Sequence, residues 1–211
     1  MKIENETHEV FFQKEKIRVK NSQSAVFFDR DGVVNKRIID GYVKTVEEFE
    51  FEDSFFELFE LINKLGFISI LVTNQQCVDK GIITVEKLQE IHNFMQENLL
   101  ANTNYCFTEI YFCPYLADSG SKYRKPEAGM FIDAINKYDI DTENSWTIGD
   151  AITDMQAGKK VGTKTILIGD FKDNSFKDIP EADYIFATVK EVLEFLNEVF
   201  NETICTDKFL Q

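Results

Sequence analysis

The sequence predicts an α/β fold in which one doubly wound, Rossmann-like parallel sheet carries helices on both faces. Short apolar segments alternate with longer segments in which apolar residues recur every three or four positions, the pattern of strands alternating with amphipathic helices. The segment 25–28 is apolar without interruption, as expected of a strand buried on both faces. Right-handed βαβ units then give a single parallel sheet.

The elements can be justified in order from this first strand. Ser54 and Glu57 have the spacing of a capping box, so we expect a helix from residue 55 that ends at Gly66. Apolar periodicity then predicts the other elements. The strands are expected at residues 67–72, 109–112, 146–148, 165–168 and 184–186, and the helices at residues 84–100, 130–138, 153–160 and 189–200.

The ends of the chain lack this alternation. Residues 1–23 are polar and charged apart from the apolar residues 10–12, which indicates an N-terminal extension with one short strand. We expect one catalytic domain at residues 24–200 and a C-terminal tail at residues 201–211. The gaps between the predicted strand ends are filled by the predicted elements, so they leave no room for a large cap domain of about 50 residues or more.

The amino-acid composition argues against several classes of function. The 211 residues include 37 acidic and 23 basic side chains, a formal charge of −14, which repels phosphate backbones and argues against a nucleic-acid partner. Apolar runs are too short for a membrane span, and the acidic N-terminus lacks a signal-peptide core, so we expect a cytoplasmic protein. The four scattered cysteines suit reduced thiols better than disulfides or a structural zinc site.

Acidic residues follow the first predicted strand. Asp29 and Asp31 are two residues apart, so an extended backbone points both carboxylates the same way. A simple Asp-Gly turn is the alternative explanation for this segment. A calcium loop fits poorly, because Val33 and Val34 stand where that loop needs a polar ligand and a glycine.

Three further polar segments follow strands. They are Thr73-Asn74-Gln75, Arg124-Lys125-Pro126, and Gly149-Asp150 with Asp154 one helical turn later. Each alone could be a polar loop, a surface charge pair or a helix cap. The carboxyl ends of parallel strands meet at one edge, where ligands bind, so together they predict a shared site. Carboxylates with a lone lysine suit Mg²⁺ and a phosphate.

These four segments resemble the motifs of the haloacid dehalogenase superfamily, whose phosphatases use an aspartate nucleophile. The likeness extends over about residues 24–190. Within the superfamily the chain is most similar to the D-glycero-D-manno-heptose 1,7-bisphosphate phosphatases, through the segments 29–35, 41–43, 49–51, 125–130 and 154–157. The histidinol-phosphate phosphatases, which usually lack the Gly-Tyr-Val segment at 41–43, are the second candidate.

The resemblance implies a role for each motif residue. Asp29 would be the nucleophile and Asp31 the general acid and base. Mg²⁺ would be held by Asp29, the backbone carbonyl of Asp31 and Asp150. The substrate would be a small phosphorylated metabolite, bound by the residues Thr73, Asn74, Gln75, Arg124 and Lys125. Asp154 is expected to orient Lys125 or a metal-bound water.

Two departures from the family pattern affect the substrate. A zinc loop often precedes the Arg-Lys-Pro motif in this group, but here only Cys113 remains, so no structural zinc is expected. Ala151 stands where relatives often have a substrate-binding lysine. We expect a monomer with an open site, whose selectivity comes from the loops at residues 33–50 and 113–123.

Other function classes remain open at this stage. A nucleic-acid 3′-phosphatase or a protein phosphatase could use the same motifs, although the chain has no basic stripe. A catalytically dead binding module would be expected to lack the nucleophile or its acid, and both are present. His92 lies beside the apolar stripe of its predicted helix and is expected at the edge of the core.

Overall fold

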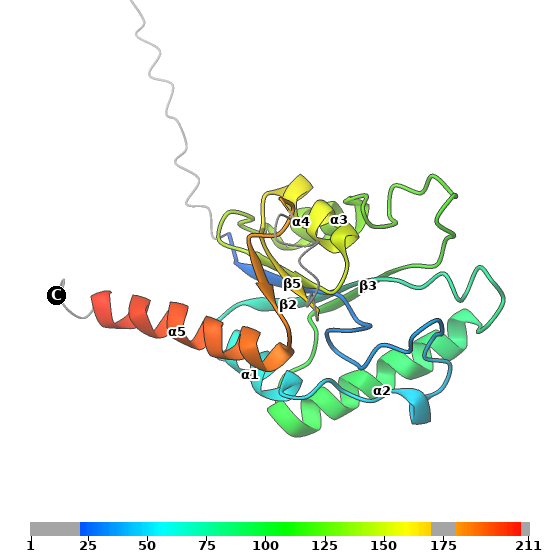
Figure 1. Cartoon of the computed structure of the whole chain (residues 1–211), viewed down its shortest axis with the longest axis horizontal. Helices are drawn as coiled ribbons and strands as arrows, with labels where there is room; N and C mark the ends of the chain where they lie inside the picture. The colour runs from blue at the N-terminus through cyan, green and yellow to red at the C-terminus, as the bar shows by residue number, and fades with distance from the viewer. Residues whose placement is uncertain (1–21, 170–179, 208–211) are drawn as a thin grey trace, which may run out of the picture.

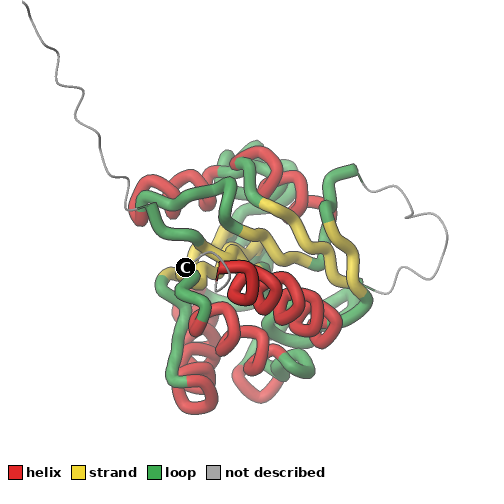
Figure 2. Tube along the Cα trace, turned by 90° about the vertical axis from the view of Figure 1, so that its left-hand side faces the viewer, coloured by secondary structure: helices red, strands yellow, loops and turns green. Residues whose placement is uncertain are grey.

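The computed structural model, which describes residues 22–169 and 180–207, contains a six-stranded parallel sheet (Figures 1 and 2). The sheet order is β3-β2-β1-β4-β5-β6. The strands are β1 Ala25–Phe28, β2 Ile68–Asn74, β3 Glu109–Cys113, β4 Trp146–Gly149, β5 Lys164–Ile168 and β6 Tyr184–Phe186. The helices are α1 Phe55–Lys64, α2 Val85–Thr103, α3 Gly129–Tyr138, α4 Ile152–Val161 and α5 Val189–Asp207, with a short 3-10 turn η1 at Val46–Glu48.

Helices cover both faces of the sheet. In Figure 1, α3 and α4 lie above the strands, while α1, α2 and α5 lie below them. Each face has its own apolar cluster, because a parallel strand buried on both sides sends alternate side chains into two layers. Val26 and Phe28 of β1 enter the layer with α1, α2 and α5, whereas Ala25 and Phe27 enter the layer with α3 and α4.

Phenylalanines form the centre of the larger layer. Phe28 of β1 packs edge-on against Phe55 and Phe107, and Phe59 of α1 lies 4.8 Å from Phe107 between ring centroids. Phe28, Phe55 and Phe59 are fully buried, and Phe107 is only 3% exposed. This packing fixes the position of β1, and Asp29 follows directly after the last residue of that strand.

The element order follows the sequence prediction, and the deviations have physical reasons. Ser54 does not cap α1 as expected: it is left-handed (φ +66°), whereas a capping residue is extended, and its side chain makes no capping hydrogen bond. β2 runs two residues past Val72, because β3 pairs with it as far as Asn74. The last helix continues to Asp207, beyond its expected end at Phe200.

The connections that border the site are loops rather than a second domain. Between Asp29 and Ser54 the only helical segment is η1, and residues 114–128 contain neither helix nor strand. The expectation of no large cap domain is therefore confirmed. No helix in the described ranges is both long enough and apolar enough to span a bilayer. The short strand expected near residues 10–12 lies outside the described residues.

Phe59→Ala tests the aromatic layer. Removing this fully buried ring leaves a cavity, so we expect the free energy of unfolding to fall by about 3–5 kcal/mol. Urea unfolding followed by circular dichroism measures this change. Ile132→Ala, at a helix position that is 48% exposed, is the matched control and should change the free energy by no more than about 0.5 kcal/mol. Similar losses for both variants would contradict this account.

Candidate active site

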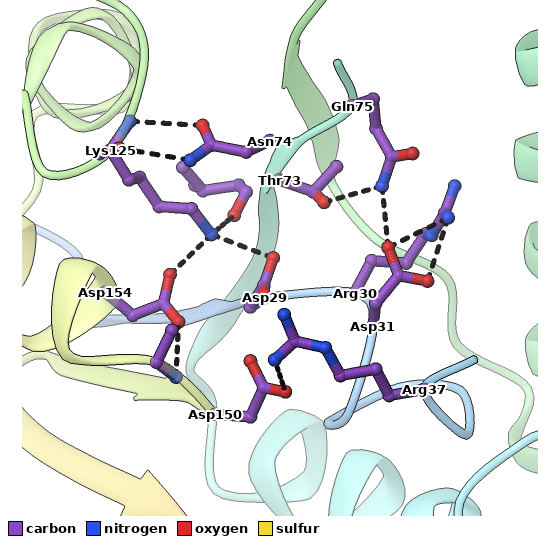
Figure 3. A network of polar contacts seen from close by, with 12 residues as sticks. Asp29, Arg30, Asp31, Arg37, Thr73, Asn74, Gln75, Lys125, Asp150 and Asp154 are labelled. Carbon is purple, nitrogen blue, oxygen red and sulfur yellow. Dashed lines mark hydrogen bonds and ion pairs between the residues drawn. The ribbon is translucent and has the colours of Figure 1, made fainter. Parts of the chain in front are cut away.

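The candidate site lies at the carboxyl edge of the sheet, where β1 sits between β2 and β4 (Figure 3). Sheet order reverses at β1, and such a switch point leaves a crevice for ligands. A cavity of about 190 Å³ opens there. Its lining includes most of the residues predicted from the sequence, namely Asp29, Asp31, Asn74, Arg124, Lys125, Asp150 and Asp154.

Lys125 is the electrostatic centre of the site. Its ammonium lies 2.8 Å from Asp29 Oδ1 and 2.6 Å from Asp154 Oδ1, and it donates to the carbonyl oxygen of Val72 at 2.7 Å. Burial alone would lower the pKa of Lys125, but the carboxylates of Asp154 and Asp29 outweigh burial and hold it above its ordinary value. The lysine is therefore a fixed positive charge.

Backbone contacts place this lysine. Asn74, at the end of β2, accepts from the Lys125 backbone N–H and donates to its carbonyl oxygen, both at 3.1 Å. Asp154, in the first turn of α4, accepts from the Ala151 N–H at 3.0 Å, which orients its other oxygen toward the lysine. The expected contact of Asp154 with Lys125 is thus present.

Asp150 approaches Asp29 closely because glycine makes room for it. A Cβ atom on Gly32, which has φ +90°, would lie 2.2 Å from Asp150 Oδ2. Burial and the neighbouring Asp29 raise the pKa of Asp150 to about 7. The guanidinium of Arg37 opposes this rise, with Nη1 2.6 Å from Asp150 Oδ2.

Three carboxylates form the group that could hold a cation. Ligand oxygens of Asp29, Asp150 and Asp154 all lie within 4.8 Å of one another. Oxygen donors of this kind suit Mg²⁺, and a bound cation would relieve the repulsion that raises the pKa of Asp150. These donors therefore fit the expected metal. The Asp31 carboxylate is outside the group, as expected for a residue assigned only a backbone ligand.

Asp31 is held by a separate set of partners. Arg30 Nη2 donates to both of its carboxylate oxygens at 2.9 Å, and Asn35 and Gln75 donate to one oxygen each. Burial raises the pKa of Asp31, but the charge and hydrogen bonds of Arg30, with those of Asn35 and Gln75, outweigh it and hold the pKa below its ordinary value. Asp31 is therefore ionised in this arrangement.

Arg30 is itself completely buried, and His92 supports it from α2. Arg30 Nη1 lies 3.4 Å from His92 Nε2, which accepts if the ring is neutral. Burial and the charge of Arg30 lower the pKa of His92 to about 3, so the ring is neutral at physiological pH. His92 is 1% exposed, which corrects the expectation that it lies at the edge of the core.

The other residues that the sequence predicted to bind substrate are Thr73, Asn74, Gln75 and Arg124. Thr73 is 1% exposed, and its hydroxyl accepts from the Gln75 amide at 3.0 Å. The side chains of Asn74 and Gln75, expected to bind substrate, contact the Lys125 backbone and the Asp31 carboxylate, and Asn74 also lines the cavity. We therefore interpret these two residues as positioning groups. Arg124 lines the cavity, and its Nη1 donates to the Tyr115 carbonyl at 2.9 Å.

Sequence reasoning missed Arg30, Arg37 and His92 as parts of the site. Arg30 stands between the two motif aspartates, where a charge after a buried strand is a visible signal. His92 and Arg37 carry no local signal, because their partners are 62 and 113 positions away along the chain.

Comparison with known proteins finds a family model and several relatives that the chain is similar to. A family model described as HAD-hydrolase-like matches residues 122–192. A D-glycero-beta-D-manno-heptose-1,7-bisphosphate 7-phosphatase of Helicobacter pylori is 34% identical, over 70% of this chain and 84% of the relative. A D-glycero-alpha-D-manno-heptose-1,7-bisphosphate 7-phosphatase of Campylobacter jejuni is also 34% identical, over 82% of this chain and 96% of the relative.

A solved structure shows the same fold. It is the D,D-heptose 1,7-bisphosphate phosphatase from B. bronchiseptica, in complex with magnesium and phosphate. The TM-score is 0.75 with 27% identity, covering 83% of this chain and 99% of that one. The resemblance found in the sequence motifs is thus confirmed.

His92→Gln tests the buried pair. The pKa of His92 is lower in the folded chain (about 3) than its ordinary 6.5, so the unfolded chain binds a proton first as the pH falls. The wild type should therefore lose up to about 1.4 kcal/mol of stability per pH unit below 6.5 through this residue, down to about pH 3. Glutamine keeps an acceptor for Arg30 and cannot titrate, so the variant should lose less.

Urea unfolding at pH 7.5, 6.5 and 5.5 measures this difference. His92→Leu is the control: it also removes the titration, but it leaves Arg30 Nη1 without the acceptor that His92 provides and should be less stable at every pH. If wild type and His92→Gln lose stability equally between pH 6.5 and 5.5, the neutral buried histidine is ruled out.

Proposed function

Because the chain belongs to the haloacid dehalogenase superfamily and is a phosphatase, we propose that it removes the 7-phosphate from D-glycero-D-manno-heptose 1,7-bisphosphate. The observation that carries the proposal is one cavity lined by a nucleophile and by separate cationic groups. Asp29 and the buried Lys125 would meet one phosphoryl group, and Arg124 lines the same cavity, where it would meet a second anion. A bisphosphate needs both.

Asp29 performs the first displacement in this mechanism. Its carboxylate oxygen forms a bond to phosphorus, and the bond from phosphorus to the sugar oxygen breaks, which leaves an aspartyl-phosphate. Lys125 orients Asp29 through the contact at 2.8 Å and offsets the negative charge on the phosphoryl oxygens. The leaving alkoxide takes a proton from Asp31.

Asp31 then works as a base in the second displacement. It accepts a proton from water, the water oxygen bonds to phosphorus, and the bond from phosphorus to Asp29 breaks to release inorganic phosphate. The contact with Arg30 keeps Asp31 ionised, which suits this step. The acid role of the first step requires protonated Asp31. Asp31 must therefore leave Arg30 and take up a proton from water before it protonates the sugar oxygen, and it recovers a proton from the attacking water in the second step.

Asp29, Asp150 and the backbone carbonyl of Asp31 would hold Mg²⁺. The ion would reduce the repulsion between nucleophile and phosphate and stabilise charge on the phosphoryl oxygens. The donor chemistry of the acidic group supports this assignment, as does the magnesium and phosphate named for the similar structure. The expected monomer, the cytoplasmic location and the division at residues 24–200 stay predictions.

Asp29→Asn tests the nucleophile. The amide is nearly the same size but cannot attack phosphorus, so we expect turnover to fall at least a thousandfold while the fold is kept. Phosphate release is measured with the heptose bisphosphate and Mg²⁺, and circular dichroism checks the fold. Asp53→Asn is a suitable control, because the Asp53 side chain is 93% exposed, and it should keep wild-type turnover. Near-normal turnover by Asp29→Asn would refute the assignment.

A substrate panel tests the specificity. Phosphate release should be fastest with heptose 1,7-bisphosphate, slower with histidinol phosphate, and slowest with a 3′-phosphorylated oligonucleotide. Both anomers belong in the panel, because relatives named for each are 34% identical to this chain. EDTA should abolish release and Mg²⁺ should restore it. A preference for histidinol phosphate would overturn the heptose assignment, and no turnover on any small phosphate would overturn the metabolite class.

A further inference from the structure

Arg37 is the basic residue of the site that neither the motifs nor the mechanism accounts for. It comes from the loop between β1 and α1, and its guanidinium lies against Asp150 among the motif acids (Figure 3). The two partners differ in burial, since the Arg37 side chain is 59% exposed and that of Asp150 only 11%. An exposed arginine side chain can leave such a contact with less loss of packing than a buried carboxylate can.

The charges explain why Arg37 lies there. Asp29, Asp150 and Asp154 crowd together, and Lys125 contacts Asp29 and Asp154 but not Asp150 within ion-pair distance. Arg37 supplies the missing charge at Asp150, 2.6 Å from Oδ2. The charge of Asp150 is the largest influence on the pKa of Arg37 and raises it above its ordinary value. Burial acts in the opposite direction, and the charges of Asp29 and Asp31 add to the rise. Its guanidinium is therefore a countercation for Asp150 by direct contact and for Asp29 and Asp31 at longer range.

A divalent cation cannot share this position easily. The cation would take an oxygen ligand from Asp150, which is the carboxylate that Arg37 contacts. The cation and the guanidinium would then repel each other, because both are positive and both lie on one carboxylate. Arg37 must then give up Asp150. It already lines the cavity with Lys125 and Arg124, where a phosphate would bind, and a guanidinium pairs well with phosphate oxygens.

We propose that Arg37 is the countercation of Asp150 in the metal-free enzyme, that a divalent cation displaces it, and that the freed guanidinium binds the substrate's phosphate oxygens. This inference rests on the proposed function, and it adds a substrate-binding residue whose availability depends on the metal. Binding of metal and of phosphate are thereby coupled through one side chain.

The first experiment measures metal binding without turnover. Full-length wild type and Arg37→Gln are freed of metal with EDTA, and Mg²⁺ affinity is obtained by calorimetric titration and from the Mg²⁺ dependence of Tm. Losing the competing ion pair should tighten Mg²⁺ binding about fivefold. Without metal the variant should melt about 2–4 °C below wild type, and saturating Mg²⁺ should narrow that gap.

Arg124→Gln is the matched control. It removes the same charge from the same cavity, but Arg124 donates to a carbonyl rather than to a carboxylate. Its Mg²⁺ affinity should change by no more than about twofold. Equal tightening in both variants would mean that net charge, not the contact with Asp150, sets the affinity, and would overturn the displacement.

The second experiment measures inorganic phosphate binding at saturating Mg²⁺. Arg37→Gln should weaken phosphate binding about tenfold, because a charge-assisted hydrogen bond is lost. Arg37→Lys keeps the charge and should recover part of this loss. Unchanged phosphate affinity in Arg37→Gln would overturn the second half of the proposal, and unchanged or weaker Mg²⁺ binding would overturn the first half.

These measurements separate this proposal from the proposed function. Neither experiment needs a sugar substrate, so failure of heptose turnover would leave the Arg37 result interpretable. Conversely, if Arg37 never leaves Asp150, the substrate panel still decides what the enzyme hydrolyses.

Discussion

The structure depends on keeping several carboxylates together at the edge of one sheet. Parallel strands bring Asp29 and Asp150 side by side, and the first turn of α4 adds Asp154. Such a group is stable only if positive charge lies within contact distance. Lys125 supplies it from a buried position, held at its backbone by Asn74 and at its ammonium by two carboxylates. The Arg-Lys-Pro segment therefore belongs to the fold of the site as much as to its chemistry.

Two charge systems meet at this edge and remain distinct. One centres on Lys125 and contains Asp29, while the other contains Asp31 with the buried Arg30 and His92. The separation allows neighbouring aspartates to behave differently: burial and Asp29 raise the pKa of Asp150, whereas Arg30 helps to hold the pKa of Asp31 down. The overall charge of −14 is compatible with the proposed binding of a phosphate, because Arg37, Arg124 and Lys125 all line the cavity.

The sequence predicted the architecture well because its signals are local. Apolar runs and helical periodicity located every strand and helix of the described residues apart from η1, and strand-end motifs located the site. What the sequence did not predict is either a local backbone conformation or a contact between residues far apart along the chain. Ser54 has a capping residue's chemistry but a left-handed backbone. Asn74 and Gln75 contact Lys125 and Asp31, which lie 51 and 44 positions away, and His92 is buried beside Arg30, 62 positions away.

The distribution of burial also separates fixed from movable parts of the site. Asp154 of α4 and Lys125 of the loop before α3 are 2% and 3% exposed, and they contact each other and the end of β2, so they cannot exchange partners without disturbing the core. Arg37 and Arg124 come from the two loops that border the cavity. Substitutions in these loops would change the charge beside the cavity and leave the contacts of Lys125 in place. In the proposed mechanism the buried residues therefore carry out the reaction, and the loop arginines select the phosphate.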